Sequence, residues 1–144
     1  MKKLFVFFIF LTYCFSGEIE ISNVFAKQTM DHKNGAVFMD ITNNLEADVK
    51  IIGASSSAYE AVELHTHKIM DNMMAMVKIN DIDIPKDSTI KLMPKGLHFM
   101  LFGAKKEINN NKGIDLTINF NTGKSVTIKN ILLFDAKKKL FLEK

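Results

Sequence analysis

The sequence predicts an all-β protein folded as a Greek-key β-sandwich. Its strand-type segments are short runs of β-branched and aromatic residues, separated by turns of Asn, Asp, Gly and Lys. No long stretch with helical periodicity competes with them. The chain has 144 residues, which is enough for one packed core, and it contains neither an internal repeat nor a low-complexity linker. We therefore expect a single two-layered domain after the N-terminal segment.

The expected strands follow one another closely along the chain. In order, they cover residues 19–25, 36–42, 48–53, 61–66, 73–79, 88–93, 97–102, 114–120 and 125–134. The run 114–120 shows the pattern most clearly, because its large apolar residues alternate with Asp, Thr and Asn, as a half-buried strand requires. The Asn-rich stretch 109–113 before it is predicted to be a loop. About nine short strands of this kind favour an immunoglobulin-like or cupredoxin-like sandwich.

Residues 1–17 have the features of a signal peptide. Two lysines precede an apolar run over residues 4–11, and small residues follow it. The apolar run is shorter than the about 20 residues that span a bilayer, although an uncleaved leader would act as a loose anchor. The predicted mature domain covers residues 18–144 and is exported to the periplasm.

Cys14 suggests an alternative form of processing. Leu11-Thr12-Tyr13-Cys14 resembles a bacterial lipoprotein cleavage box, but Tyr13 is bulkier than the residue expected before the cysteine. Cys14 is also the only cysteine in the sequence. The predicted mature domain therefore has neither a disulfide nor a thiolate, which excludes thiol–disulfide chemistry.

The charge pattern argues against a nucleic-acid partner. The chain has 19 basic and 16 acidic residues, and removal of Lys2 and Lys3 with the leader reduces the basic count by two, to 17. Every basic side chain is a lysine, and most lysines are scattered among acidic residues, so there is no arginine fork for phosphate and no basic stripe. The dense cluster at residues 137–139 is interpreted as a solvated C-terminal tail.

Three of the runs carry His and Met residues on the face opposite the predicted core. In each run these residues alternate with large apolar ones, so that Leu64 and Phe99, for example, mark the inner face. Met76 shares its face with Lys78, which favours solvent for both. The outward-facing donor residues are His65, Met76, His98 and Met100. We expect these four side chains to lie close to solvent.

Imidazole and thioether groups on an outer face point to a soft metal. An exposed methionine side chain gains no burial free energy, so its position needs another explanation. Metal binding provides one, because Cu(I) accepts sulfur and imidazole ligands at low coordination number. Such a set stays available in an oxidising compartment, where thiols are lost. The sequence therefore predicts a Cu(I) site.

The chain contains further histidines and methionines whose roles stay open. Nine methionines are present, and four of them fall within residues 70–76. Met73 and Met74 either form a soft rim that guides copper inward or simply pack against neighbours. His67 either assists copper capture or is an exposed residue at a strand end, and the second interpretation applies also to His32 in its polar loop.

The spacing of the four donors resembles the signature of the periplasmic copper chaperone family PCu(A)C. Ten residues separate His65 from Met76, twenty-one separate Met76 from His98, and one separates His98 from Met100. The resemblance continues through Val62-Glu63-Leu64-His65 and the stretch 92–101, and covers nearly all of the exported part. Asn43 and Asn44 at an early strand end, Ile84-Pro85, and Gly123 in the last hairpin also fit the family pattern.

The chain departs from the family pattern at several positions. Phe25 and Lys27 stand where members usually have tryptophan and arginine, and Lys95 replaces a glycine before the second histidine. The sequence also lacks the His- and Met-rich C-terminal extension of some members. None of these changes affects a proposed ligand.

The resemblance implies a cupredoxin-like protein that binds Cu(I) near its surface. It also implies delivery of the metal to a copper acceptor, either the copper-centre subunit of cytochrome c oxidase or another copper chaperone. Copper sequestration in the periplasm by the same site is the main alternative, and a metal-free structural or adhesive sandwich is a further one.

The sequence fits an electron-transfer protein or an enzyme less well than a copper-binding protein. A blue-copper site needs a cysteine thiolate, and a zinc hydrolase needs three His or carboxylate ligands and a nearby base. The sequence offers neither arrangement in the mature domain. It therefore predicts a binding protein and not an enzyme.

Overall fold

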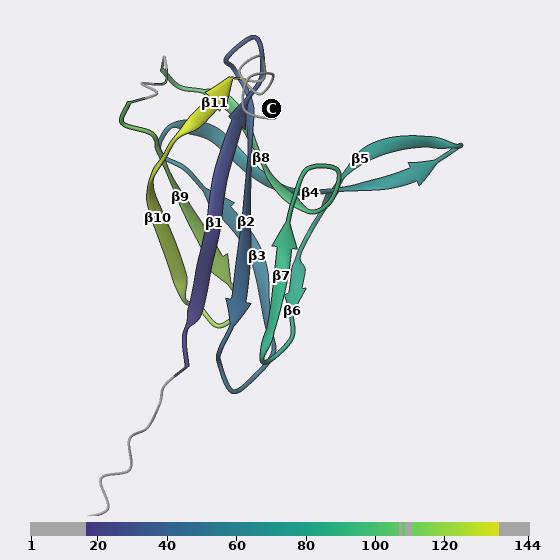
Figure 1. Cartoon of the computed structure of the whole chain (residues 1–144), viewed down its shortest axis with the longest axis vertical. Coiled ribbons are helices and arrows are strands. Elements are labelled where there is room, and N and C mark those ends of the chain that lie inside the picture. Colours follow the sequence, from purple (N-terminus) through teal and green to yellow (C-terminus); the bar gives the residue numbers. More distant parts are fainter. Residues whose placement is uncertain (1–16, 107, 109–110, 136–144) are drawn as a thin grey trace, which may run out of the picture.

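The computed structural model describes residues 17–106, 108 and 111–135, and every regular element in it is a β-strand (Figure 1). The strands are β1 (Ile19–Gln28), β2 (Gly35–Asn43), β3 (Val49–Ser55), β4 (Tyr59–Met70), β5 (Met73–Ile79), β6 (Ile82–Ile84), β7 (Ser88–Leu92), β8 (His98–Ala104), β9 (Ile114–Phe120), β10 (Ser125–Ile131) and β11 (Leu133–Asp135). The predicted signal peptide with Cys14, except for Gly17, and the predicted lysine tail lie outside the described residues. In the part of the chain that is described, no helix has the length and apolar character needed to span a membrane.

The strands hydrogen-bond into one continuous sheet that folds over into two layers. The order is β10-β9-β3-β4-β8-β2-β1-β11, and β5, β6 and β7 are joined to β4, β3 and β2. β11 follows β10 directly along the chain but pairs in parallel with β1, while β10 pairs with β9. The chain therefore crosses between layers at this corner, and the predicted all-β Greek-key sandwich is confirmed.

The core lies between the layers and is built from one face of each strand. In β9 the predicted alternation is confirmed, because its four apolar residues are buried and its polar ones are only half-buried. In β2 the inward residues Val37, Met39 and Ile41 are fully buried. Each such side chain contributes about 1.5–3 kcal/mol of burial free energy relative to an exposed position.

The structure differs most from the predicted strands at three places. β4 is longer than the predicted 61–66, because it continues beyond the body and pairs with β5. The predicted run 125–134 forms two strands, since Asn130 has φ 59° and the β9–β10 register shifts between Ile128 and Ile131. β6 was not predicted, because its three residues are too few to show a period of two.

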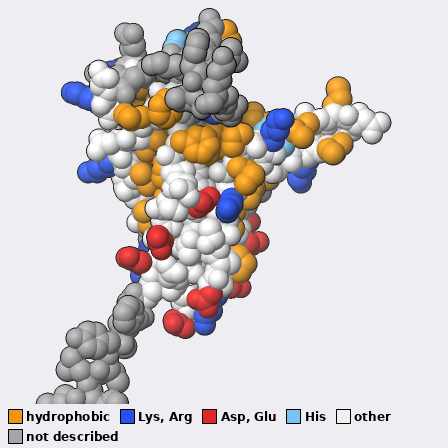
Figure 2. Space-filling model, in the orientation of Figure 1, with side chains coloured by type: hydrophobic (Ala, Val, Ile, Leu, Met, Phe, Trp, Pro, Cys, Tyr) orange, Lys and Arg blue, Asp and Glu red, His pale blue; other side chains and the backbone are white. Residues whose placement is uncertain are grey.

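β4 and β5 form a hairpin that projects from the body, as Figure 1 shows. Met70 pairs with Met73, which leaves Asp71 and Asn72 as a two-residue turn. Both turn residues have positive φ, 50° and 61°, as a type I′ turn requires, and its twist matches that of the paired strands. We call residues 66–77 the arm. The arm carries exposed methionines away from the core, and Figure 2 shows hydrophobic side chains along it.

Candidate metal centre

The candidate site lies where the arm leaves the body. β4 pairs with β8 from Tyr59 to His65, and with β5 from Leu64 to Met70. His65 is therefore the last residue of the β4–β8 ladder, where it pairs with His98, and it is also paired with Lys78 of β5. The change of partner strand brings donors from three strands to one place.

Strand register places the predicted donors on one face. Paired residues of neighbouring strands share a face, and so do residues two apart in one strand. The pairs His65 with His98, His67 with Met76, and Glu63 with Met100 therefore all lie on the same side. The opposite side carries buried residues such as Leu64, Phe99 and Leu101. The predicted division between core face and donor face is confirmed.

The prediction that all four donors lie close to solvent is wrong for the histidines. His65 is 7% exposed and His98 is 3% exposed. The physical reason is that aromatic side chains cover this outer face. The Phe38 ring lies 5.9 Å from the His98 ring, and the Phe102 ring lies 5.8 Å from the His65 ring, measured between centroids.

The two methionines are less buried than the histidines. Met76 is 45% exposed, which confirms that it lies outside the core. Met100 is half-buried and lies two residues from His98 along β8, on the same face. The site therefore has buried imidazoles and at least one sulfur that solvent reaches.

A tight turn before β8 positions His98. The Met93 amide donates to the Leu97 carbonyl at 2.9 Å, and the Gly96 amide donates to the Met93 carbonyl at 3.0 Å. Lys95 within this turn has φ 66°, a conformation that glycine adopts more readily. The turn aims the Gly96 carbonyl at the His98 ring and so fixes the orientation of that ring.

His98 is oriented with one ring nitrogen toward the sulfur of Met76. Its Nδ1 donates to the Gly96 carbonyl oxygen at 2.9 Å, because a carbonyl only accepts. Its Nε2 lies 3.3 Å from Met76 Sδ. Burial lowers the pKa of His98 below its ordinary value, and the nearby His67 and His65 act in the same direction, whereas the Gly96 hydrogen bond opposes them. The ring is therefore held neutral at physiological pH with its Nε2 lone pair toward the thioether.

The distance between His98 Nε2 and Met76 Sδ fits two ligands of one metal ion. With the metal–nitrogen distance of about 2.0 Å and the metal–sulfur distance of about 2.3 Å found at zinc sites, such ligands lie about 3.0 Å apart at a right angle and about 4.3 Å apart when opposite. The observed 3.3 Å falls within this range. The pair is preorganised for coordination.

His65 has a carboxylate partner on one nitrogen and none on the other. Its Nε2 lies 2.9 Å from Glu63 Oε2, and Lys78 Nζ donates to Glu63 Oε1 at 3.0 Å. The hydrogen bonds from His65 and then from Lys78 lower the pKa of Glu63, so the carboxylate is ionised and accepts the Nε2 proton. In the neutral form of the ring, His65 Nδ1 is then the acceptor nitrogen, and it is buried without a hydrogen-bond partner. A carboxylate that orients a histidine in this way is typical of metal-binding histidines.

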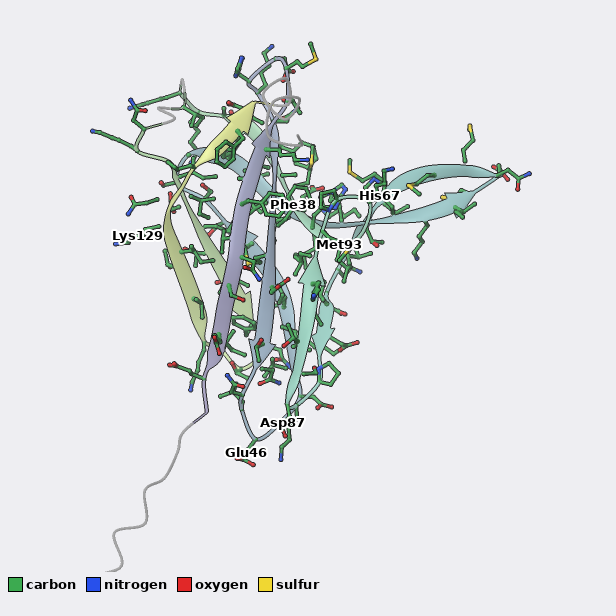
Figure 3. The ribbon with its side chains drawn as sticks, viewed as in Figure 1. Phe38, Glu46, His67, Asp87, Met93 and Lys129 are labelled. Atoms are coloured by element: carbon green, nitrogen blue, oxygen red, sulfur yellow. The ribbon has the colours of Figure 1, made fainter. Side chains whose placement is uncertain are left out.

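His67 also lies at this site, where Figure 3 shows it at the base of the arm. Its ring centroid is 5.4 Å from that of His98, compared with 5.9 Å between His65 and His98. Its Nδ1 is buried without a hydrogen-bond partner. The spacing motif does not include His67. The sequence offered two signals for it, its position two residues from His65 on the same strand face and the methionine-rich turn that follows.

The predicted metal donors on this face are imidazole and thioether groups. Among residues 17–106, 108 and 111–135, no three His, Cys, Asp or Glu side chains are grouped so as to hold a metal ion. The structure brings His65, Met76 and His98 together and places Met100 beside them on the same face. Orphaned imidazole nitrogens beside a thioether are a donor set that a soft cation fits.

The fold is a β-sandwich like that of PCuAC domains. The copper-bound PCuAC domain from PmoF2 is 19% identical and superposes with a TM-score of 0.66 over 82% of this chain and 94% of that domain. The solution structure of CuI-DR1885 from Deinococcus radiodurans is 21% identical, with a TM-score of 0.56 over 83% of this chain and 80% of that one. The resemblance seen in the sequence is thus confirmed at the level of the fold.

The family of this sequence is shown by a match that is independent of the structural likeness. The chain matches the family described as "Putative lipoprotein LpqE-like" over residues 19–131, and it belongs to that family. A relative described as "Putative lipoprotein Lxx21020", from Leifsonia xyli subsp. xyli, is 32% identical over 89 residues, which cover 61% of this chain and 54% of the relative. The chain therefore spans about half the length of this curated relative.

Proposed function

We propose that the protein binds one Cu(I) ion through His65, Met76, His98 and Met100 and passes it to another protein outside the cytoplasm. The contact between Met76 Sδ and His98 Nε2 is the observation that carries this proposal, because it joins a soft sulfur to an unprotonated imidazole nitrogen. The buried, unpartnered Nδ1 of His65 supplies a second nitrogen on the same face. The names of the structural relatives, a copper-bound PCuAC domain and CuI-DR1885, support copper as the metal.

The ligand set suits transport more than catalysis. All four donors are neutral, and the partly exposed Met76 allows ligand exchange with a partner without unfolding. In this proposal copper is the cargo of a binding protein, which is not an enzyme. The copper acceptor is the copper-centre subunit of cytochrome c oxidase or another copper chaperone, and this recipient rests on the resemblance to PCu(A)C proteins.

We also propose that the protein is exported to the periplasm. The predicted signal peptide over residues 1–17 supports export, and the family and the curated relative are both described as lipoproteins. These descriptions favour lipid attachment at Cys14 despite the bulky Tyr13 before it. Membrane contact is then made only through the lipid on Cys14, and the domain over residues 18–144 acts as one unit.

Copper sequestration is the second candidate, and one observation favours it. His65 and His98 are almost fully buried, which slows loss of a bound ion. The discriminating experiment mixes the Cu(I)-loaded protein with the apo copper-centre domain of cytochrome c oxidase under reducing conditions. We expect most of the copper to move to the acceptor, as measured by its optical spectrum after oxidation. Complete retention by the protein would replace delivery with sequestration.

Copper affinity is expected to fall in acid. An imidazole binds metal only when neutral, and an ordinary histidine has a pKa of about 6.5. Because burial lowers the pKa of His98, protons compete at this residue only below its ordinary pKa. Affinity should therefore be nearly constant above pH 7 and weaken as the pH falls through about 6. Competition titrations against a Cu(I) chelator between pH 5 and 8 check this, and a flat profile would contradict histidine ligation.

A further inference from the structure

Access to the two buried histidines is restricted. His65 and His98 are covered by Phe102 and Phe38, so a copper ion that reaches them from solvent has to pass neighbouring side chains. Met76 is the partly exposed residue that contacts His98. It comes from β5, two strands away from β8, and so its side chain reaches across β4. Donors that lie around Met76 on the arm therefore lie along the approach to the inner site.

The arm register identifies which donors these are. His67 pairs directly with Met76, and Met74 lies two residues from Met76 on the same face. Met74 is 58% exposed. Met70 and Met73 pair with each other and lie on the opposite face of the arm. The cluster of four methionines is thus divided, and Met74 continues the donor face toward the tip.

His67 provides a nitrogen donor between Met74 and the inner site. Its Nδ1 is buried and has no hydrogen-bond partner, which carries a free-energy cost unless something else satisfies it. The His67 ring lies beside the His98 ring at 5.4 Å. A copper ion held by His67 and the arm sulfurs is therefore one ligand exchange away from the inner imidazoles.

We propose that His67, Met74 and Met76 form an outer Cu(I) position on the arm, through which copper enters and leaves the inner site. This inference rests on the proposed Cu(I) binding. Met76 belongs to both positions, so copper keeps its bond to the Met76 sulfur during transfer. Outward movement forms bonds to His67 and Met74 as bonds to the inner imidazoles break. The copper stays Cu(I) throughout, so the exchange of ligands requires no oxidant or reductant.

The test measures, for each variant, both the rate at which Cu(I) is removed and the equilibrium affinity for Cu(I). Cu(I) is removed from the loaded full-length protein by an excess of a coloured Cu(I) chelator in a stopped-flow instrument. His67→Gln and Met74→Leu are each expected to slow removal by about tenfold, the low end of the effect of losing a supporting residue at a metal site. Their equilibrium affinities should change far less, because the inner ligands are intact. Met73→Leu is the matched control, since Met73 also carries an exposed sulfur, 71% against 58% for Met74, but lies on the other face of the arm, and its rate should equal that of the wild type.

Nuclear magnetic resonance of the methionine methyl groups gives an independent readout. On addition of Cu(I), we expect the Met74 signal to shift together with that of Met76, and the Met73 signal to stay in place. Removal rates for His67→Gln and Met74→Leu equal to that of Met73→Leu, with no shift at Met74, would overturn the outer position. Failure of the wild-type protein to bind Cu(I) is a different result, and it would overturn the proposed function itself.

Discussion

Replacing His98 with glutamine is expected to lower the affinity for Cu(I) by about 100-fold or more. Loss of a residue that supports a metal ligand typically lowers metal affinity by about 10-fold to 100-fold. Loss of a ligand itself should cost at least the upper end of this range. His98 is central to the site, because its Nε2 contacts Met76 Sδ and its ring lies beside those of His65 and His67. Glutamine keeps a polar group within reach of the Gly96 carbonyl but provides no imidazole. The measurement is a competition titration against a Cu(I) chelator.

The control for this substitution is His32→Gln. His32 is exposed, lies in the turn after β1 and interacts with Gln28, so its loss should leave copper affinity unchanged. Because His98 is buried, circular dichroism and urea unfolding establish that the variant is folded. His65→Gln provides a second test from the neighbouring strand. Wild-type affinity in a folded His98→Gln protein would remove His98 from the proposed ligand set.

Replacing Met76 with leucine is expected to lower Cu(I) affinity by about tenfold to 100-fold while the fold stays intact. Leucine retains the size and apolar character of methionine but lacks the sulfur, and swaps of this kind usually cost less than about 1.5 kcal/mol of unfolding free energy. Met76 is partly exposed, so the cost should be at the low end. Chelator competition measures the affinity, and urea unfolding measures the stability.

Met93→Leu is the matched control, because Met93 is exposed to a similar degree, 48% against 45%, and lies in the turn before β8. Met100→Leu extends the test to the half-buried thioether. Equal affinity in Met76→Leu and Met93→Leu would show that the Met76 sulfur is not a ligand. Unfolding of Met100→Leu would show that Met100 serves packing.

The faces of the strands could be predicted from the sequence, but the exposure of each residue could not. Alternation with Leu64 and Phe99 correctly placed His65 and His98 opposite the core. It could not reveal that Phe38 of β2 and Phe102 of β8 cover these histidines, because that depends on which strands become neighbours. An outer face of a sheet is solvent-exposed only where nothing packs on it.

The full extent of the arm also could not be predicted from the sequence. The run 73–79 was predicted correctly, yet the sequence did not reveal that β4 changes partner at His65 and continues to Met70. Asp71-Asn72 lacks the glycine of the strongest hairpin signals, although both residues tolerate positive φ. Alternation in the predicted run 73–79 already placed Met74 on the face of Met76, but only the register shows that His67 pairs with Met76 and that Met70 pairs with Met73.

X-ray absorption at the copper edge of the Cu(I)-loaded protein tests the central claim most directly. We predict a Cu(I) ion with both nitrogen and thioether sulfur in its first shell, about two of each. A shell of nitrogen and oxygen alone would contradict the assignment of Met76 and Met100. Loss of all copper during desalting under reducing conditions would contradict the site as a whole.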